Sequence, residues 1–506
     1  MSPADDSQQA VMDFLGAPST YGGAAVKRID THAASVFLAG DRALKIKRAV
    51  RFPFLDYSSL AKRKAACEAE LEVNRPYALE IYRRVVPITR AGSGFAIGGA
   101  GEPVEWAVEM RRFDETQTLD HLAERGAIDT ALADALGLAV ARAHATAPLA
   151  DNFDFTAQLA EVIRQNDAEL RETPRLFAPD ALTTLTQAAR GALLRLTPLI
   201  AARGRHGFVR RCHGDLHLGN IVLIGGKPVL FDAIEFDPAI ASGDVLYDLA
   251  FLLMDLIERR LSAAANTVFN RYLNETRRDE NLDAVAALPL YLSLRAAIRA
   301  KVAAEKFKQG DAGVAQAARD YFALAQKFLE PAVPQLIAVG GLSGTGKSLL
   351  ARDLAPLLAP PPGAVWLRSD VERKALFGMG ETERLPQSAY GAEVTARVYA
   401  ALAAKAKRVI AAGHSAVVDA VFADPGERAA IELAAPGAFH GLFLAATLAT
   451  RLSRVGARMG DASDADAAVA RRQEQYDLGP MQWTEIDASG SPQDTLRRVK
   501  DKLGLA

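Results

Sequence analysis

Short apolar runs that end at Gly or at charged residues dominate the chain from about residue 20 to 112. Such runs are typical of β-strands, and they include AAVKRID, SVFLAG, RALKIKR, RVVPITR, FAIGG and WAVEMRRF. The stretch from about Ser59 to Leu79 is instead rich in Ala, Glu, Lys and Arg, which favours a helix. The pattern predicts a mostly β lobe that contains one helix.

The pattern becomes mostly helical from residue 115 to about 330, with a short island of strands and loops at 208–237. A break follows at Glu330-Pro-Ala-Val-Pro334, and after it a buried-strand pattern, QLIAVGG, leads into a helix pattern. This alternation continues to the end and predicts a parallel sheet covered on both faces. We therefore expect two domains. The first, 1–330, is α+β and bilobal, with lobes at about 20–112 and 113–330, and the second, 335–506, is α/β.

Charge and cysteine content narrow the class of protein. The 506 residues carry 60 Lys+Arg against 61 Asp+Glu, so the basic excess of a nucleic-acid binder is missing. The two cysteines, Cys67 and Cys212, cannot form a Cys-based metal site alone. The acidic N-terminus lacks a signal-peptide pattern, and no apolar run reaches the roughly 20 residues of a membrane span. We expect a cytoplasmic protein without nucleic-acid or membrane partners.

The segment His213-Gly-Asp-Leu-His-Leu-Gly-Asn220 places an Asp, Asp215, five positions before Asn220. A second Asp, Asp232, ends the apolar run that follows. Phosphoryl transfer needs a carboxylate to orient and deprotonate the attacking hydroxyl, and oxygen ligands for Mg²⁺. The pattern suits Asp215 for the first role, and Asn220 and Asp232 for the metal. A polar turn between strands would not require this combination of residues.

This segment, together with LFDAIEFD and Gly243-Asp-Val-Leu-Tyr-Asp-Leu-Ala250, closely resembles the aminoglycoside phosphotransferase family of protein-kinase-like small-molecule kinases. The resemblance covers about residues 20–330. It implies a bilobal protein-kinase-like fold with ATP in the cleft and a small-molecule hydroxyl as the acceptor. Asp244 and Asp248 are expected to cap a helix or brace the catalytic loop.

The same resemblance implies a Lys for the nucleotide phosphates and a Glu that holds it. Lys45 and Lys47 share one face of a strand, because side chains repeat every two residues. The following helix offers Glu68, Glu70 and Glu72. We favour Lys45 with Glu70 as cofactor-binding residues, and the other combinations stay open.

Two further segments of the first domain bear on nucleotide binding. Thr31-His-Ala-Ala-Ser35 stands where protein kinases have a Gly-rich loop, so backbone N–H groups and the Ser35 hydroxyl are left to cover the phosphates. Glu109-Met-Arg-Arg-Phe113 falls where the hinge between lobes is expected, and adenine would bond to its backbone.

The second domain opens with Gly341-Leu-Ser-Gly-Thr-Gly-Lys-Ser348, a full match to the phosphate-binding P-loop between a strand and a helix. Its glycines let backbone N–H groups close around a phosphate at a helix N-terminus. Lys347 is expected to bind the β- and γ-phosphates, and the Ser348 hydroxyl is expected to bind Mg²⁺. The predicted cofactor-binding residues of this loop are Gly341, Ser343, Gly344, Thr345, Gly346, Lys347 and Ser348.

Carboxylates follow the next two apolar strands of this domain. Asp370 follows VWLR with Arg373 close behind, and Asp419 ends SAVVD. A carboxylate at the end of a parallel strand can bind Mg²⁺ through water or meet an acceptor hydroxyl. This half resembles the small P-loop kinases, such as gluconate, shikimate and adenylylsulfate kinases, and predicted kinases labelled AAA. The resemblance implies that Asp370 and Arg373 bind the acceptor, and that Asp419 binds the metal or the acceptor. We therefore predict that Asp370 and Asp419 are catalytic residues.

Three arginines of the second domain share one face of a predicted helix, namely Arg451, Arg454 and Arg458. Arginines that converge on a nucleotide form a lid that stabilises transition-state charge, so Arg454 and Arg458 are predicted to bind the cofactor. A solvated helix face is the alternative.

Each half of the sequence thus has a full set of phosphate-handling residues. We expect a bifunctional phosphotransferase that uses ATP and Mg²⁺ at two sites, with small-molecule hydroxyl acceptors such as sugars, aminosugars or aminoglycoside-like compounds. Two alternatives stay open: one half senses nucleotide while the other catalyses, or the first half phosphorylates protein. The acceptors, the choice of ATP or GTP and the oligomeric state are not predicted.

Overall fold

The computed structural model describes residues 3–52, 55–456 and 462–505. The chain separates into two compact units that each combine several segments. The first comprises Met1–Ala135, Arg142–Phe155 and Gly204–Leu252, and the second comprises Leu136–Ala141, Thr156–Arg203 and Leu253–Ala506. The boundary predicted at 330–335 therefore lies inside the second unit.

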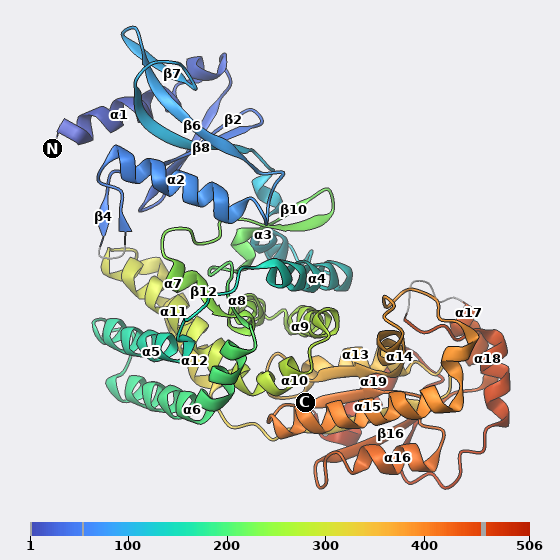
Figure 1. Cartoon of the computed structure of the whole chain (residues 1–506). Helices are drawn as coiled ribbons and strands as arrows, with labels where there is room; N and C mark the ends of the chain where they lie inside the picture. The colour runs from blue at the N-terminus through green and yellow to red at the C-terminus, as the bar shows by residue number, and fades with distance from the viewer. Residues whose placement is uncertain (1–2, 53–54, 457–461, 506) are drawn as a thin grey trace. The chain divides into compact units, whose positions relative to one another are not determined.

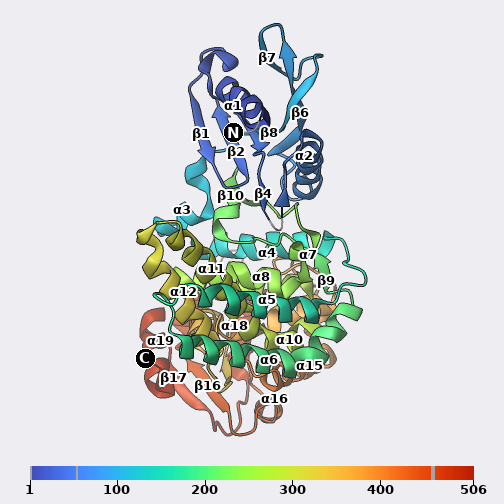
Figure 2. The same ribbon diagram turned by 90° about the vertical axis from the view of Figure 1, so that its left-hand side faces the viewer.

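A sheet of six antiparallel strands in the order β1-β2-β3-β8-β6-β7 forms the N-terminal part of the first unit (Figures 1 and 2). The strands are β1 (Val26–Asp30), β2 (Ala34–Ala39), β3 (Arg42–Lys47), β6 (Tyr82–Ala91), β7 (Gly94–Ile97) and β8 (Pro103–Arg111). The expected helix is α2 (Leu60–Asn74), and an N-terminal helix that the pattern did not predict is α1 (Pro3–Gly16).

Alternate residues of these strands face the two helices. Phe37 and Leu44 pack with residues of α1 on one face of the sheet. Leu38 and Ala43 pack with Cys67 of α2 on the other face. Because both faces are covered, the strands carry apolar residues in both orientations, and Lys45 and Lys47 lie on the face of α2.

The rest of the first unit holds two antiparallel strand pairs, and residues 213–220 lie between the first strands of the two pairs. The pairs are β9 (Val209–Arg211) with β12 (Ser242–Asp244), and β10 (Ile221–Ile224) with β11 (Lys227–Leu230). Short strands β4 (Arg51–Phe52) and β5 (Leu55–Asp56) also belong to this unit. The helices between residues 115 and 330 are α3 (Leu119–Glu124), α4 (Thr130–Thr146), α5 (Phe155–Arg171), α6 (Pro179–Arg205), α7 (Pro238–Ala241), α8 (Val245–Glu258), α9 (Ser262–Thr276), α10 (Glu280–Ala284), α11 (Leu288–Lys308) and α12 (Ala315–Phe328).

A fully parallel five-stranded sheet in the order β14-β15-β13-β16-β17 forms the C-terminal region, as the alternating pattern predicted. The strands are β13 (Leu336–Gly341), β14 (Val365–Arg368), β15 (Ala416–Asp419), β16 (Phe439–Ala445) and β17 (Thr484–Asp487). The helices are α13 (Lys347–Leu354), α14 (Ser369–Leu376), α15 (Ala392–Ala411), α16 (Pro425–Glu432), α17 (Leu448–Gly456), α18 (Ala467–Arg472) and α19 (Pro492–Leu503). Leu350 of α13 and Val499 of α19 share one buried cluster with the strands.

Helix α9, which precedes residue 330, also belongs to the second unit, and its polar side chains bond to the segment that begins β14. Asn266 donates from Nδ2 to the carbonyl oxygen of Ala364, 3.0 Å away. Asn270 donates to the same oxygen and accepts from the backbone N–H of Trp366 at 2.6 Å. Both asparagines are buried, so these bonds fix α9 against the start of β14.

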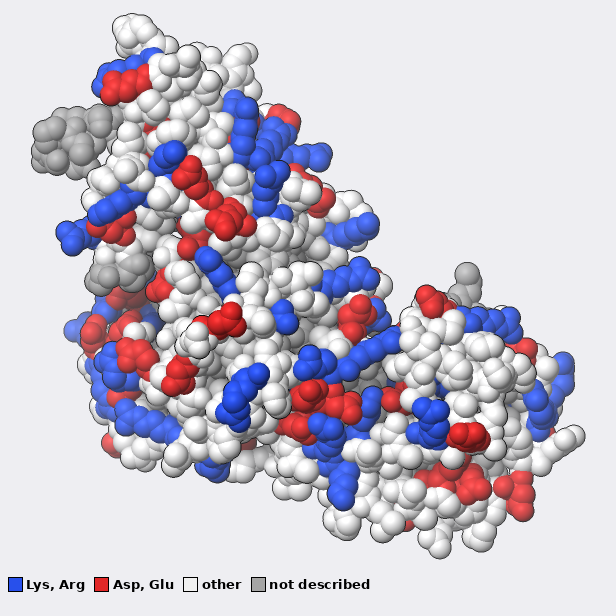
Figure 3. Space-filling view, in the orientation of Figure 1, with Lys and Arg blue, Asp and Glu red and all other residues white. Residues whose placement is uncertain are grey.

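Acidic and basic side chains are interspersed on the face shown in Figure 3, in line with the balanced composition. Within the described part of the chain, none of the helices combines the length and the low charge that a bilayer crossing requires.

Candidate active sites

The first site is built on the loop that follows β9. Gly214 has φ of 83°, a left-handed conformation that favours glycine, and its N–H donates to Asp248 Oδ1 at 2.8 Å. The ring of His213 is buried, and its Nε2 lies 2.9 Å from the Phe231 carbonyl oxygen, so Nε2 carries the proton. Burial lowers the pKa of His213, which keeps the ring neutral. These contacts fix the backbone that leads into Asp215.

Asp215 lies beside Asn220, as the spacing predicted. The Asn220 Nδ2 donates to Asp215 Oδ2 and to the Asp215 carbonyl oxygen, both at 3.0 Å. The His217 Nδ1 accepts from the N–H of Gly219 at 3.1 Å, so its proton is on Nε2, which faces Asp215 Oδ2 at 3.4 Å. The carboxylate of Asp215 is thereby oriented while its side chain stays 41% exposed.

Asp232 follows β11 with φ of 60°, which is unusual for a residue with a side chain. Its N–H donates to the hydroxyl oxygen of Tyr82 at 3.1 Å. The next residue, Ala233, is held at both backbone groups by the side chain of Asn74, at the end of α2. The surrounding contacts therefore maintain this conformation and direct the carboxylate towards Lys45, whose Nζ is 2.7 Å from Asp232 Oδ1.

The predicted pair of Lys45 and Glu70 is in contact, with 2.8 Å between Nζ and Oε1. Lys47 is also in contact with Glu70, at 2.6 Å, so Glu70 joins both lysines. Glu68 and Glu72 are exposed. Burial opposes the charge of Lys45, but the carboxylates of Asp232 and Glu70 outweigh it and hold the pKa of Lys45 well above its ordinary value.

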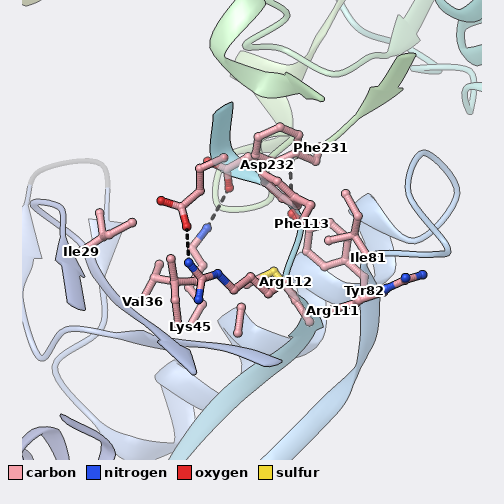
Figure 4. A pocket seen from close by; sticks show the side chains of 14 residues that line it. Ile29, Val36, Lys45, Ile81, Tyr82, Arg111, Arg112, Phe113, Phe231 and Asp232 are labelled. Carbon is pink, nitrogen blue, oxygen red and sulfur yellow. Dashed lines mark hydrogen bonds and ion pairs between the residues drawn. The ribbon is translucent and has the colours of Figure 1, made fainter. Parts of the chain in front are cut away.

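A cavity of about 150 Å³ opens beside Lys45 and Asp232 (Figure 4). Its apolar lining comes from the sheet, from the segment after β8 and from β11, and includes Ile29, Val36, Ala43, Met110, Phe113 and Phe231. The segment Glu109–Phe113 thus borders the cavity, although Glu109 itself pairs with Arg42 and Arg84 at 2.8 Å each. Ser35 is buried and donates to Asp30 at 2.6 Å.

The second site is the P-loop between β13 and α13. Gly341, Gly344 and Gly346 have φ of 140°, 86° and 95°, so each adopts a conformation that favours glycine. A Cβ on Gly344 would lie 2.5 Å from the carbonyl oxygen of Arg451. The loop borders a cavity of about 350 Å³, and its lining includes Ser343, Gly344, Thr345, Gly346, Lys347, Ser348, Asp370 and Arg454.

Asp419 ends β15 beside this loop and is buried. Burial raises the pKa of Asp419, while Lys347 and Arg368 oppose that rise. The Ser348 hydroxyl lies near its carboxyl and also helps to lower the pKa of Asp419. The structure therefore brings the predicted Ser348 and Asp419 together, and Asp370 borders the same cavity.

The predicted arginines of the second domain differ in their surroundings. Arg454 borders the cavity and donates to the Thr345 carbonyl oxygen at 3.3 Å. Arg373 is buried and donates to the carbonyl oxygen of Ala389 at 2.8 Å, so its guanidinium supports the loop before α15. Arg458 lies outside the described residues.

The sequence predicts that Arg451 belongs to a lid over the nucleotide. In the structure its side chain is instead buried against the backbone of the P-loop. Its Nε donates to the Ser343 carbonyl oxygen at 2.9 Å, and one terminal nitrogen donates to the Ala470 carbonyl oxygen at 3.0 Å. Gln473 accepts from the Ser343 N–H at 2.7 Å. The sequence pattern did not identify Gln473 as a P-loop contact, because Ser343, the residue that it contacts, is 130 residues away in the chain.

Comparisons with known proteins match both regions. Residues 78–288 match the model described as phosphotransferase enzyme family, and residues 336–477 match the model described as AAA domain. Uncharacterized proteins of Mycobacterium tuberculosis and Mycobacterium bovis are 30% identical over 476 residues, which cover 91% of this chain and 92% of theirs. The chain belongs to the family of these mycobacterial proteins, with a kinase-like phosphotransferase region followed by a P-loop kinase-like region.

Solved structures match one region each. A choline/ethanolamine kinase family protein from Mesorhizobium loti is 19% identical over 64% of this chain and 95% of its own, with a TM-score of 0.41. An aminoglycoside phosphotransferase from Alicyclobacillus acidocaldarius is 14% identical over 60% of this chain and 89% of its own, with a TM-score of 0.36. A gluconokinase from Sinorhizobium meliloti 1021 is 19% identical over 34% of this chain and 97% of its own, with a TM-score of 0.25.

Proposed function

We propose that this protein is a bifunctional ATP-dependent phosphotransferase that transfers the γ-phosphoryl group to hydroxyl groups of small molecules at two separate sites. The observation that carries the proposal is that each compact unit holds its own cavity bordered by a lysine of a phosphate-handling motif, Lys45 in the first and Lys347 in the second. The acceptor class is that of sugars, aminosugars and aminoglycoside-like compounds.

At the first site, Asp215 accepts the proton of the attacking hydroxyl, because its carboxylate is exposed and oriented by Asn220 and His217. Lys45 binds phosphate oxygens, and the apolar cavity beside it takes the adenine. The oxygen donors Asn220 and Asp232 fit Mg²⁺, which prefers such ligands. When bound, Mg²⁺ neutralises charge on the phosphates.

At the second site, the glycines of the P-loop let backbone N–H groups surround a phosphate, and a Cβ on Gly344 would distort this cradle. Lys347 binds the β- and γ-phosphates, and Arg454 stabilises charge that develops on the transferred group. Ser348 and Asp419 supply the oxygen donors that suit Mg²⁺, and the influence of the Ser348 hydroxyl on the pKa of Asp419 supports their proximity. Asp370, at the cavity wall, orients the acceptor hydroxyl; Arg373 supports that region from behind.

Coupled ADP release against a panel of sugars, aminosugars, aminoglycosides, polyols and nucleosides tests the proposal. Asp215→Asn and Lys347→Ala are compared with the exposed controls Asp151→Asn and Lys502→Ala. We expect each site variant to lose a different acceptor-dependent activity while both controls retain both. If one variant loses every activity and the other none, the silent half is a sensor or scaffold. Phosphorylation of the protein itself without acceptor, seen by intact mass, would instead indicate a protein kinase.

A further inference from the structure

The carboxylate of Asp464 contacts the segment that follows α14, while its chain neighbour Ser463 borders the cavity beside the P-loop. We propose that Asp464 is a positioning residue that couples nucleotide binding at the P-loop to the ordering of residues 379–390, on the acceptor side of the second site. This inference rests on the proposed function of that site. It adds an order of binding, in which the nucleotide binds first and fixes the acceptor side.

Three donors from two neighbouring elements converge on the Asp464 carboxylate. Its Oδ2 accepts from the Tyr390 hydroxyl at 2.7 Å and from the Leu385 N–H at 3.0 Å. Its Oδ1 lies 3.4 Å from the ammonium nitrogen of Lys374 in α14. Burial opposes the charge of Asp464, but these donors outweigh it and lower the pKa of the carboxyl. One carboxylate therefore holds both the helix and the segment that follows it.

Lys374 connects this contact to the residue proposed to orient the acceptor. Its side chain is only 1% exposed, and its Nζ also donates to the carbonyl oxygen of Glu381 at 2.7 Å. Lys374 lies one helical turn after Asp370, which borders the cavity beside the P-loop. A change in the position of α14 at Lys374 would therefore also move Asp370.

The chain on either side of Asp464 lies against the nucleotide site. Ser463, directly before it, borders the cavity. After it, the carbonyl oxygen of Ala470 in α18 accepts from Arg451, which also donates to Ser343 of the P-loop. A nucleotide that fills this cavity therefore restricts the chain on both sides of Asp464, and the Asp464 carboxylate extends this restriction to residues 379–390.

Amide hydrogen exchange of residues 379–390, measured by mass spectrometry on the full chain with and without a non-hydrolysable ATP analogue and Mg²⁺, tests the proposal. We expect the analogue to slow exchange of this segment about fivefold or more in the wild-type protein, because coupling between two sites is commonly of that size. Asp464→Ala removes the acceptor of all three donors, so exchange is expected to be faster and to respond no longer to the analogue.

Two further variants make the comparison specific. Tyr390→Phe removes one of the three donors and is expected to retain part of the response. Asp501→Asn removes an exposed carboxylate from α19 of the same unit and is the control that keeps the full response. If Asp464→Ala does not fold, Asp464→Asn, which removes the negative charge that faces Lys374, provides the same comparison.

The response to the nucleotide distinguishes coupling from simple support of the fold. If the analogue does not slow exchange of residues 379–390 in the wild-type protein, Asp464 only supports the segment and the proposal is overturned. It is also overturned if Asp464→Ala keeps the full response, or if Lys347→Ala shows the response without nucleotide at the P-loop. If titration finds as many bound nucleotides in Lys347→Ala as in the wild type, the proposed function of this site fails instead.

Discussion

Replacement of Arg451 by Met tests how the P-loop is supported from beneath. The guanidinium is buried and donates to the carbonyl oxygens of Ser343 and Ala470. Methionine fills part of the volume of the arginine side chain but donates no hydrogen bond, so the carbonyl oxygens of Ser343 and Ala470 both lose their charged donor. A buried acceptor left without a partner costs about 1–3 kcal/mol, so the two together give about 4 kcal/mol. Arg451 also forms an ion pair with Glu474, whose side chain is 44% exposed. Water can replace this exposed ion pair at little cost in free energy.

We expect two measurable consequences of Arg451→Met. The free energy of unfolding of the second unit falls by about 4 kcal/mol in urea, followed by the fluorescence of Trp366 and Trp483. Nucleotide affinity at the P-loop falls about tenfold or more, because the Ser343 carbonyl is no longer held. Arg471→Met, which removes an exposed arginine from α18, is the matched control.

Arg451 does not support the P-loop in this way if the free energy of unfolding of Arg451→Met is within about 0.5 kcal/mol of the wild type, the range of ordinary surface substitutions. The same conclusion follows if stability falls but nucleotide affinity at the P-loop does not change. In that case Arg451 would stabilise the fold without shaping the phosphate cradle.

Three further changes have defined outcomes. Gly344→Ala places a Cβ 2.5 Å from a backbone oxygen at φ of 86°, so nucleotide binding at the P-loop is expected to be lost, as measured by titration calorimetry. Burial lowers the pKa of His414 from 6.5 to about 4, so the unfolded chain binds this proton first as pH falls. His414 therefore contributes a loss of about 3 kcal/mol of stability between pH 6.5 and 4, and His414→Gln, measured by urea unfolding across that range, should make the pH dependence shallower by about that amount. Asn270→Ala leaves the Trp366 N–H without its acceptor and is expected to cost about 1–3 kcal/mol in the same assay, whereas an unchanged midpoint would show that α9 contributes no stability there.

The main features of both sites were predictable because their residues are close in sequence. The P-loop, its strand and its helix form one continuous segment, and the spacing of Asp215 and Asn220 matches the hydrogen bond between them. The parallel sheet followed from alternating strand and helix patterns, since such alternation leaves few other arrangements.

Other features depended on long-range packing that no local pattern encodes. Lys45 was a candidate from strand periodicity, but a shared Glu70 between two lysines required the position of α2 against β3. Arg451 lay on the predicted helix face, yet its P-loop partner Ser343 is 108 residues earlier in the chain. Helix α1 was missed altogether, although Gln8 fixes the end of β3.

Equilibrium titration with a non-hydrolysable ATP analogue in the presence of Mg²⁺ counts the nucleotide sites that one chain holds. The wild-type protein is predicted to bind two equivalents per chain, and Lys45→Met and Lys347→Ala are each predicted to lose one, a different one in each case. A stoichiometry of one for the wild type, or the loss of both equivalents in a single variant, would contradict the account of two independent sites.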